Sequence, residues 1–488
     1  MSGRPGGDPG LLDLLTATME RAAGRCAYAD ARRVVTAREQ LSTRNGAVER
    51  IRVDESDGIG VRVRVGGAWG FAATTDISPA GAELALKRAL AFASEQPGVA
   101  EQALAPVAPA RGEWHGPCER DPFAIGVEEK LELLLGAEAG LAGDQRLVRT
   151  EAHCLSVRTA KGFASTDGAA CTQTQFECGG SISAVAVDGS ELQQRSYPGG
   201  HEGGVAAAGW EQVEALELGA HAPRVADEAL ELLGAPQCPS GATTVVLDGE
   251  QVALQLHESI GHALELDRML GNEASYAGTS WVSPDDLGRL RYGSERLNVT
   301  ADATLPGGLG SFGWDDEGVG ARSLELIREG RLRAALSSRE SAAAIGLDAS
   351  GGCARADGHA RQPIVRMTNV SLEPGEAGSL EDLIADTKDG LYLETNRSWS
   401  IDDRRLQFQF ATEVGRQIRG GQLGRLYRNP SYAGVTPSFW ASLDAVCSRP
   451  QWRLWGLVNC GKGEPGQLAH VSHGTAPARF HAVQVGVA

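Results

Sequence analysis

The sequence predicts an α+β fold, in which an N-terminal α/β domain precedes a β-rich C-terminal half that carries one important helix. In the first part, Val61, Val63 and Val65 alternate with arginines, which is typical of a strand with one buried face. In the second part, strand-sized apolar segments are separated by glycines. The chain has 488 residues, more than the roughly 250–300 that one hydrophobic core supports, so more than one domain is expected.

Shifts in composition divide the chain into three parts. Residues 1–25 are expected to form a flexible N-terminal tail and a first helix. Residues 26–238 are expected to form the α/β domain, with a candidate sub-boundary in the Ala/Pro/Gly-rich stretch 100–117, which resembles a linker or a long surface connection. Residues 239–488 are expected to form the β-rich domain.

Local signals predict the elements of the N-terminal domain in order. Asn45-Gly46 is a hairpin signal between two strand-like segments. Ser78-Pro79 predicts a helix start, because the serine caps the helix and proline is tolerated at its first position. A second helix is expected near 127–142, and strands are expected around 155–157 and 181–187.

A strand followed by a helix is the main feature of the second half. Thr243–Leu247 is β-branched and apolar, and Asp248 with Gln251 three residues later matches a capping box. Val252, Leu256 and Ala263 continue at helical spacing. The later strand-sized segments lie at residues 364–367, 391–394, 406–410 and 483–485.

The composition excludes several classes of protein. A net charge of −17 argues against a nucleic-acid binder and against attachment to anionic membranes. Residues 1–10 are rich in Gly and Pro and lack the features of a signal peptide, so a cytoplasmic protein is expected. The nine cysteines are odd in number and contain no C-x-x-C pair, which is not a disulfide framework.

The helix that follows Asp248 carries the pattern H-E-x-x-x-H at His257, Glu258 and His262. This pattern is one residue longer than the H-E-x-x-H of most zinc peptidases. Residues five apart on a regular α-helix point about 140° from each other, so the two imidazoles could not reach one metal. A π-type turn with i→i+5 bonding would realign them. We therefore expect a π-bulge or kink at 259–262, eased by Gly261.

Two histidines bound to zinc would place Glu258 beside the metal-bound water. Glu258 would then act as the general base on a water whose pKa the metal lowers to about 7. A catalytic zinc normally has three protein ligands. The residues that could supply the third are local or distant, namely Glu265, Asp267, Cys460, His470 and His473.

Further segments make the sequence recognisable: it resembles the TldD/PmbA family of metallopeptidases, in particular the TldD-type subunit that retains the metal site. The resemblance covers nearly the whole chain after the first 25 or so residues, and the order of its blocks makes it specific. These blocks lie at residues 41–46, 60–63, 67–72, 257–265, 312–318, 366–369, 373–375, 459–467 and 471–474.

The resemblance implies that zinc is bound by His257, His262 and Cys460, with Glu258 as general base. For Glu265 and Asp267, two interpretations stay open: solvated helix positions, or acceptors for the free ring N–H of a ligand histidine. His470 and His473 are expected to be loop histidines near the site, and Lys462 to be an exposed loop lysine or a partner of the thiolate or oxyanion.

Two further groups of side chains are left without a firm role. Asp315, Asp316 and Glu317 could bind an amine or a cation, or form a solvated acidic turn. Four tryptophans are expected to be core or interface aromatics rather than surfaces for substrate. They are Trp314, Trp399, Trp452 and Trp455.

The implied function is that of a zinc-dependent metallopeptidase, with residues 239–488 as its metallopeptidase domain. It would hydrolyse peptide bonds in short or unfolded peptides through metal-activated water. The family resemblance also implies a dimer, expected to be a heterodimer with a PmbA/TldE-type homologue, with a homodimer as the alternative. Two other functions stay open: a specialised hydrolase that matures a peptide or amide natural product, and a non-catalytic scaffold whose zinc is structural.

Overall fold

The computed structural model describes residues 10–96, 98–199 and 204–486. The structure is α+β, as predicted, and residues 1–9 of the expected tail lie outside the described residues. Within the described part, the N-terminal half is built on a seven-stranded sheet in the order β3-β2-β1-β5-β6-β4, with β7 paired to β6. The strands are β1 (Tyr28–Arg44), β2 (Ala47–Val65), β3 (Ala68–Thr74), β4 (Arg111–His115), β5 (Leu147–Ser165), β6 (Ala170–Asp188) and β7 (Glu191–Tyr197).

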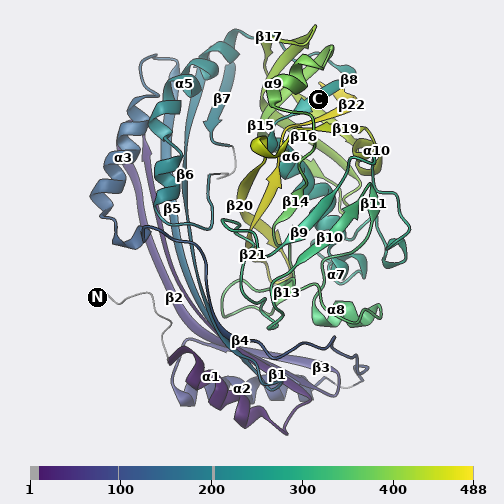
Figure 1. The fold of residues 1–488 in the computed structure, drawn as a ribbon. Coiled ribbons are helices and arrows are strands. Elements are labelled where there is room, and N and C mark those ends of the chain that lie inside the picture. The colour runs from purple at the N-terminus through teal and green to yellow at the C-terminus, as the bar shows by residue number, and fades with distance from the viewer. Residues whose placement is uncertain (1–9, 97, 200–203, 487–488) are drawn as a thin grey trace.

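Four of these strands are long, and the sheet that they form bends beneath the C-terminal half (Figure 1). The predicted turn at Asn45-Gly46 is confirmed: both residues have positive φ (49° and 78°), and they join β1 to β2. At Gly58 and Gly60 of β2 the loop around His359 approaches so closely that an added Cβ would lie 2.3 Å from it. Glycine at these positions lets the C-terminal half dock on the sheet.

Helices cover the sheet at its two ends (Figure 1). α1 (Gly10–Ala22) and α2 (Pro79–Ser94) pack on the lower end, where Leu15, Val61 and Leu86 share one core. α3 (Val127–Ala139) and α5 (Leu218–Gly234) pack near the other end, and the short α4 (Glu211–Ala215) precedes α5. The Ser78 hydroxyl accepts a hydrogen bond from the Gly81 N–H at 3.2 Å, which confirms the predicted cap of α2.

The predicted connection at residues 100–117 contains a strand. Residues 111–115 form β4, which runs parallel to β6 in register with residues 170–174. The sequence of this segment has no strand pattern because β4 is an edge strand that buries little surface: four of its five residues are exposed.

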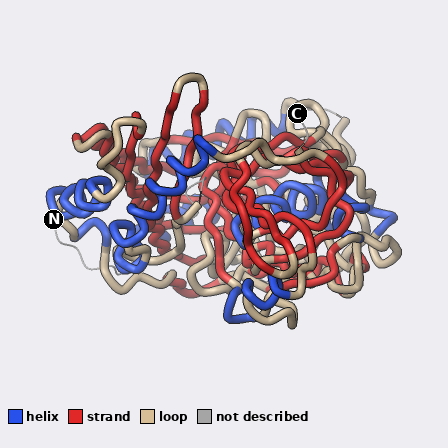
Figure 2. Tube along the Cα trace, turned by 90° about the horizontal axis from the view of Figure 1, so that it is seen from above, coloured by secondary structure: helices blue, strands red, loops and turns tan. Residues whose placement is uncertain are grey.

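The C-terminal half contains a closed ring of strands. Among the described residues, β15 pairs with β8, β8 with β22, β22 with β18, β18 with β16, and β16 again with β15. Figure 2 shows these strands as a rounded wall with helical segments inside it. They are β8 (Gly241–Leu247), β15 (Asp389–Ile401), β16 (Gln407–Arg419), β18 (Ser431–Val435) and β22 (Ala478–Val485), with β17 (Gln422–Tyr427) and β19 (Leu443–Val446) at the margins.

Smaller elements surround this ring. One four-stranded sheet has the order β11-β10-β9-β14, β12 pairs with β13, and β20 pairs with β21. The strands are β9 (Val299–Asp302), β10 (Ser323–Arg328), β11 (Arg331–Leu332), β12 (Ala354–Arg355), β13 (Ile364–Val365), β14 (Val370–Leu372), β20 (Arg453–Lys462) and β21 (Gln467–Thr475). The helices are α6 (Gly249–Leu256), α7 (Leu266–Met269), α8 (Arg339–Ala344), α9 (Leu380–Ala385) and α10 (Thr436–Ala441).

Helix α6 lies at the centre of this half. All of its residues are buried, and it contacts β15 on one side and β14, β20 and β21 on others. No helix in the described ranges is both long enough and apolar enough to cross a membrane. All nine cysteines are described and unpaired, which confirms the prediction that they form no disulfide framework.

Candidate metal centre

The helix that carries the histidine motif changes its winding at the motif. α6 is followed by a π-helical turn over His257–Gly261 and a 3₁₀ turn over His262–Leu264. The His262 N–H bonds to the His257 carbonyl, an i→i+5 bond, so the predicted π-type distortion is confirmed. Gly261 has ordinary helical angles; its missing side chain makes room for Met367, whose sulfur would lie 2.1 Å from an added Cβ.

The start of α6 agrees with the sequence in part. The Asp248 carboxylate accepts from the Gln251 N–H at 2.8 Å, as a helix cap does. The second half of the expected capping box is wrong, because the Gln251 amide donates to the Tyr432 hydroxyl at 2.7 Å. The Asp248 N–H bonds instead to the Leu393 carbonyl of β15, which ties the helix start to the strand ring.

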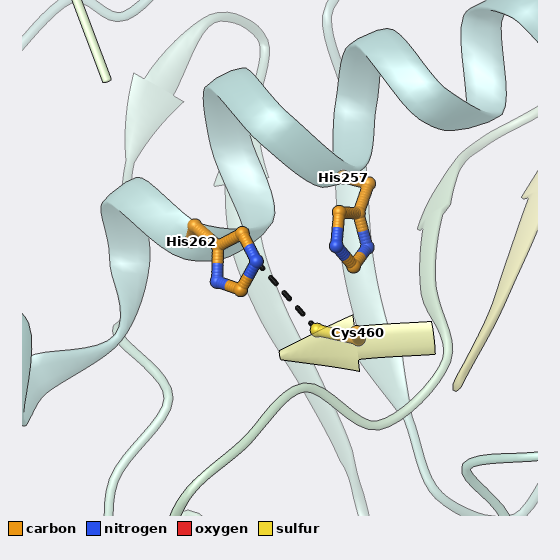
Figure 3. Close-up of side chains that lie close together, drawn as sticks. All are labelled: His257, His262 and Cys460. Atoms are coloured by element: carbon orange, nitrogen blue, oxygen red, sulfur yellow. Dashed lines mark hydrogen bonds between the residues drawn. The ribbon is translucent and has the colours of Figure 1, made fainter. Parts of the chain in front are cut away.

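The π turn brings both motif histidines to one thiol. One donor atom from each of His257, His262 and Cys460 lies within 4.8 Å of the others, and all three residues are buried. The His262 Nε2 and Cys460 Sγ atoms are 3.6 Å apart (Figure 3). Two such donors on one tetrahedral zinc would be about 3.5 Å apart, from usual Zn–N and Zn–S bond lengths. Cys460 lies on strand β20, and the tertiary fold brings this strand to the π turn.

Hydrogen bonds on the far side of each histidine leave its Nε2 atom for a ligand. The His473 Nδ1–H donates to the Val370 carbonyl at 2.8 Å, so its Nε2 accepts from the His257 Nδ1–H, also at 2.8 Å. The Glu265 carboxylate accepts from the His262 Nδ1–H at 3.0 Å. The unprotonated Nε2 atoms of His257 and His262 are therefore the ones free to bind a metal.

Burial keeps these imidazoles neutral. It lowers the pKa of His257 to about 4, and it lowers the pKa of His262 although Cys460 and Glu265 act in the opposite direction. The pKa of His473 lies well below its ordinary value because of burial and the nearby His257. Neutral imidazole is the form that binds metals, so the histidines are ready for coordination at neutral pH.

The Cys460 thiol is poised toward its thiolate form. Burial raises its pKa, but the positive charge of Arg366 and the His262 ring outweigh burial and leave the pKa below the ordinary value of a thiol. Arg366 is itself buried, and its guanidinium donates to the Cys460 and Gln467 carbonyls. A thiolate held beside an arginine is a strong ligand for zinc.

Behind His262 lies a buried group of charges. Lys462 donates to both carboxylate oxygens of Asp267, at 2.7 and 2.9 Å, and lies 3.3 Å from Glu265. The expectation of an exposed lysine is wrong, because Lys462 is 2% exposed. Burial raises the pKa of Glu265, but Lys462 and His262 more than offset this and hold it well below its usual range. Of the two interpretations for Glu265, the structure supports the acceptor of a histidine N–H.

The carboxylate of Glu258 is held from outside its own helix. The Trp399 indole N–H donates to its Oε1 at 2.9 Å, and the Arg405 guanidinium donates to its Oε2. Both partners come from β15 and the turn after it. Nothing in the sequence indicated a role for Arg405, and Trp399 was expected to be a core or interface aromatic. Both lie far from the histidine motif in sequence, so no local pattern could predict their contact with Glu258.

Other predicted residues lie elsewhere. His470 pairs with Glu177 of β6 and so links β21 to the N-terminal sheet, and both it and His473 are on a strand instead of a loop. Asp315, Asp316 and Glu317 are buried, so a solvated acidic turn is wrong. They bond to the cations of the N-terminal sheet and to backbone N–H groups.

Family models match nearly the full length of the chain. The model of the PmbA/TldA metallopeptidase C-terminal domain matches residues 240–486, which include His257, His262 and Cys460. The models of domain 1 and of the central domain of the same metallopeptidases match residues 29–93 and 120–235.

Curated relatives and solved structures agree with these matches. A metalloprotease of Methanothermobacter thermautotrophicus is 30% identical over 462 residues, which is 95% of this chain and 96% of the relative. A zinc metalloprotease TldD homolog of Saccharolobus solfataricus is 28% identical over 51% of this chain and 52% of the relative. The crystal structure of TldE from Thermococcus kodakarensis has the same fold, with a TM-score of 0.76, 13% identity, and coverage of 97% of this chain and 100% of that one.

Proposed function

This chain belongs to the PmbA/TldA metallopeptidase family, and on that basis we propose that it is a zinc-dependent peptidase acting on short or unfolded peptides. The observation that carries the proposal is the convergence of two neutral histidines and one thiol beside Glu258. The nitrogen and sulfur donors suit zinc in both type and spacing. The name of the relative from Saccharolobus solfataricus supports the same metal.

His257, His262 and Cys460 would hold the zinc, which supplies a Lewis acid that polarises the scissile carbonyl and acidifies water. Three protein ligands leave one position open, as catalytic sites require, whereas a structural site is closed by four. Glu258 follows His257 directly and would take a proton from the attacking water and pass it to the leaving amine. Trp399 and Arg405 hold its two oxygens during this transfer.

The route that we propose for substrate is a polar groove that includes the two residues before Cys460. It has a volume of about 430 Å³ and lies between the inner face of the N-terminal sheet and the β20–β21 hairpin. Val458 and Asn459 form one wall, and the other wall holds neutral polar side chains such as Ser181 and Gln194 together with charged ones such as Arg149. Serine and glutamine side chains hydrogen-bond to peptide groups of any sequence, which suits unstructured polypeptides.

We also propose that the chain works as the metal-bearing partner of a TldE-type homologue. The likeness of its fold to TldE supports this pairing. Light scattering of the purified chain, alone and after co-expression with such a homologue, measures the assembly. A stable 1:1 complex is expected, and a homodimer that ignores the homologue would contradict the pairing.

The function is tested by Glu258→Gln. The amide keeps the size of the side chain but cannot accept the proton, so cleavage of unfolded casein and of unstructured peptides should fall by at least about 100-fold, the lower range for general-base catalysis. Zinc content, measured by mass spectrometry, should stay at the wild-type value. Glu295→Gln is the matched control, because that side chain is 80% exposed.

Two results would overturn the proposal. One is cleavage by Glu258→Gln at the wild-type rate. The other is a wild-type chain that, with and without its homologue, holds no metal and cleaves none of these substrates.

A further inference from the structure

The β15–β16 hairpin provides both groups that hold Glu258. Trp399, near the end of β15, donates its indole N–H to Oε1 at 2.9 Å. Arg405, in the turn before β16, donates to Oε2. Each oxygen of the carboxylate is thus fixed by one donor from the same hairpin, although Glu258 itself lies on the π turn after α6.

The backbone of the hairpin is irregular near these two donors. The register between β15 and β16 shifts between Asn396 and Ser398, where one extra residue is inserted in β15. Such a bulge reverses which face of the strand the following side chains occupy, and so it redirects Trp399. Arg405 has a φ of 62°, in the left-handed region that non-glycine residues avoid.

Neighbouring groups hold this costly conformation in place. The Arg405 carbonyl accepts a hydrogen bond from the Thr436 hydroxyl at 2.8 Å, and the Arg404 carbonyl accepts one from the backbone N–H of Trp281 at 2.8 Å. The Leu406 N–H donates to the Asp402 carboxylate at 2.7 Å. Strained residues persist where the surrounding structure fixes them, and they cluster at functional sites.

Arg405 forms a largely buried ion pair with Glu258. Its side chain is 16% exposed and that of Glu258 is 8% exposed, so water screens the pair only weakly. Within the described ranges, Glu258 is the acid within 4 Å of Arg405, and the Arg405 Nε has no hydrogen-bond partner. Arg195 differs from Arg405, because its guanidinium contacts three acids, namely Glu228, Glu394 and Glu413.

We propose that Arg405 is a positioning residue, which together with Trp399 holds the Glu258 carboxylate in the orientation needed for proton transfer. This inference rests on the proposed function, since it assigns a role through Glu258. A catalytic group must be held within about 0.5 Å of its productive position. Without Arg405, one oxygen of Glu258 loses its donor and the side chain gains rotational freedom.

The test compares Arg405→Ala, Arg405→Lys and the neighbouring Arg404→Ala, an exposed control whose side chain lies outside the site. For Arg405→Ala we expect kcat to fall about 100-fold, the cost of misplacing a reacting group by about 1 Å. KM and zinc content should stay at wild-type values. Arg405→Lys should recover part of kcat, because lysine keeps the charge but not the planar donor. In a Glu258→Gln background, Arg405→Ala should lower the residual rate no further.

A second readout is independent of activity and of bound metal. In zinc-free protein labelled with ¹⁵N-tryptophan, the indole N–H resonance of Trp399 is assigned with Trp399→Phe. This resonance should shift in Arg405→Ala and in Glu258→Gln, because both substitutions change the Glu258 side chain that accepts the indole N–H. It should not move in Arg404→Ala.

Several outcomes would overturn the inference. Wild-type kcat in Arg405→Ala would do so, as would a raised KM with unchanged kcat, which indicates a residue that binds substrate. If Arg405→Ala does not fold, Arg405→Lys decides: an unmoved Trp399 resonance together with wild-type kcat rejects the role. A wild-type chain that cleaves no peptide would reject the proposed function instead, and the resonance would still report whether Arg405 orients Glu258.

Discussion

The metal centre and the ion cluster around Asp316 are both buried, but they satisfy their polar groups in opposite ways. At Asp316, the carboxylate meets Lys161 at 3.2 Å and Arg32 at 3.6 Å, and it accepts from the Ala356 N–H at 2.8 Å. Charges of one sign are therefore compensated by charges of the other. The cluster joins β1 and β5 of the N-terminal sheet to the C-terminal half.

At the candidate metal centre, residues outside the triad form hydrogen bonds with the outward side of each histidine, and the His262 Nε2 on the inward side is bonded to the Cys460 thiol. His473 and Glu265 accept the Nδ1 protons of His257 and His262, and the Nε2 atoms converge with the thiol of Cys460. Desolvated lone pairs that point at one another are costly unless a cation joins them. The difference teaches that a buried polar cluster holds the structure where its charges are paired, and that it offers a candidate metal site where several donor atoms converge on one point.

The largest effect that would test this difference comes from Cys460→Ser. Serine replaces the thiolate by a neutral hydroxyl of similar size, so zinc affinity should fall by more than the roughly 10–100-fold that loss of an outer partner costs. Peptide cleavage should be lost with the metal. The free energy of unfolding of the zinc-free protein should fall by less than the about 3–5 kcal/mol that a broken buried ion pair costs, because the serine hydroxyl can still donate to the His262 Nε2.

Competition with a chelator measures the affinity, and denaturant unfolding measures the stability. Cys353→Ser is the matched control, because Cys353 is also buried but bonds to the Gly351 carbonyl away from the triad. Wild-type zinc affinity in Cys460→Ser would remove the distinction between the two clusters.

Asp316→Asn should have the converse effect. The amide keeps the shape of the side chain but leaves the charges of Lys161 and Arg32 uncompensated, which costs about 3–5 kcal/mol for a buried pair. Zinc affinity should be unchanged, because the substitution touches no ligand. Denaturant unfolding of the zinc-free protein checks the first expectation, and chelator competition checks the second.

Asp444→Asn provides the surface counterpart. Asp444 pairs with Arg479 at 2.8 Å, but its side chain is 36% exposed, so its loss should cost no more than about 1 kcal/mol. Equal destabilisation by Asp316→Asn and Asp444→Asn would show that the buried cluster does not join the two halves of the chain.

The sequence predicted the parts of the site that depend on local spacing. The Asp248 cap, the helix after it and the π turn at the histidine motif follow from residues within five positions of one another. Cys460 came from family resemblance, because it lies 198 residues from His262. Trp399 and Arg405 are 141 and 147 residues from Glu258, and no periodicity reports such contacts.

Charged residues were the other source of error, and the reason is physical. For Lys462 and Asp316, exposure to solvent was one of the interpretations left open, because isolated charges are almost never buried. Each is buried here because an opposite charge from a distant segment meets it: Asp267 for Lys462, and Lys161 for Asp316. These pairs form only in the folded chain. The pattern of charges in the sequence therefore cannot identify which residue will neutralise a buried charge.

The smaller of the two effects on zinc affinity concerns the outward side of a ligand, and His473→Phe tests it. Phenylalanine keeps a buried ring but cannot accept the His257 Nδ1 proton, so His257 loses the bond that orients its Nε2. Zinc affinity should fall by about 10–100-fold, as it does when outer partners are removed, and His473→Gln should recover part of it through its amide oxygen. His470→Phe is the control, since His470 bonds to Glu177 and not to a ligand. Chelator competition separates the three variants. If His473→Phe binds zinc as tightly as the wild type, then convergence of the donors alone defines the site, and the hydrogen bonds behind them add nothing to it.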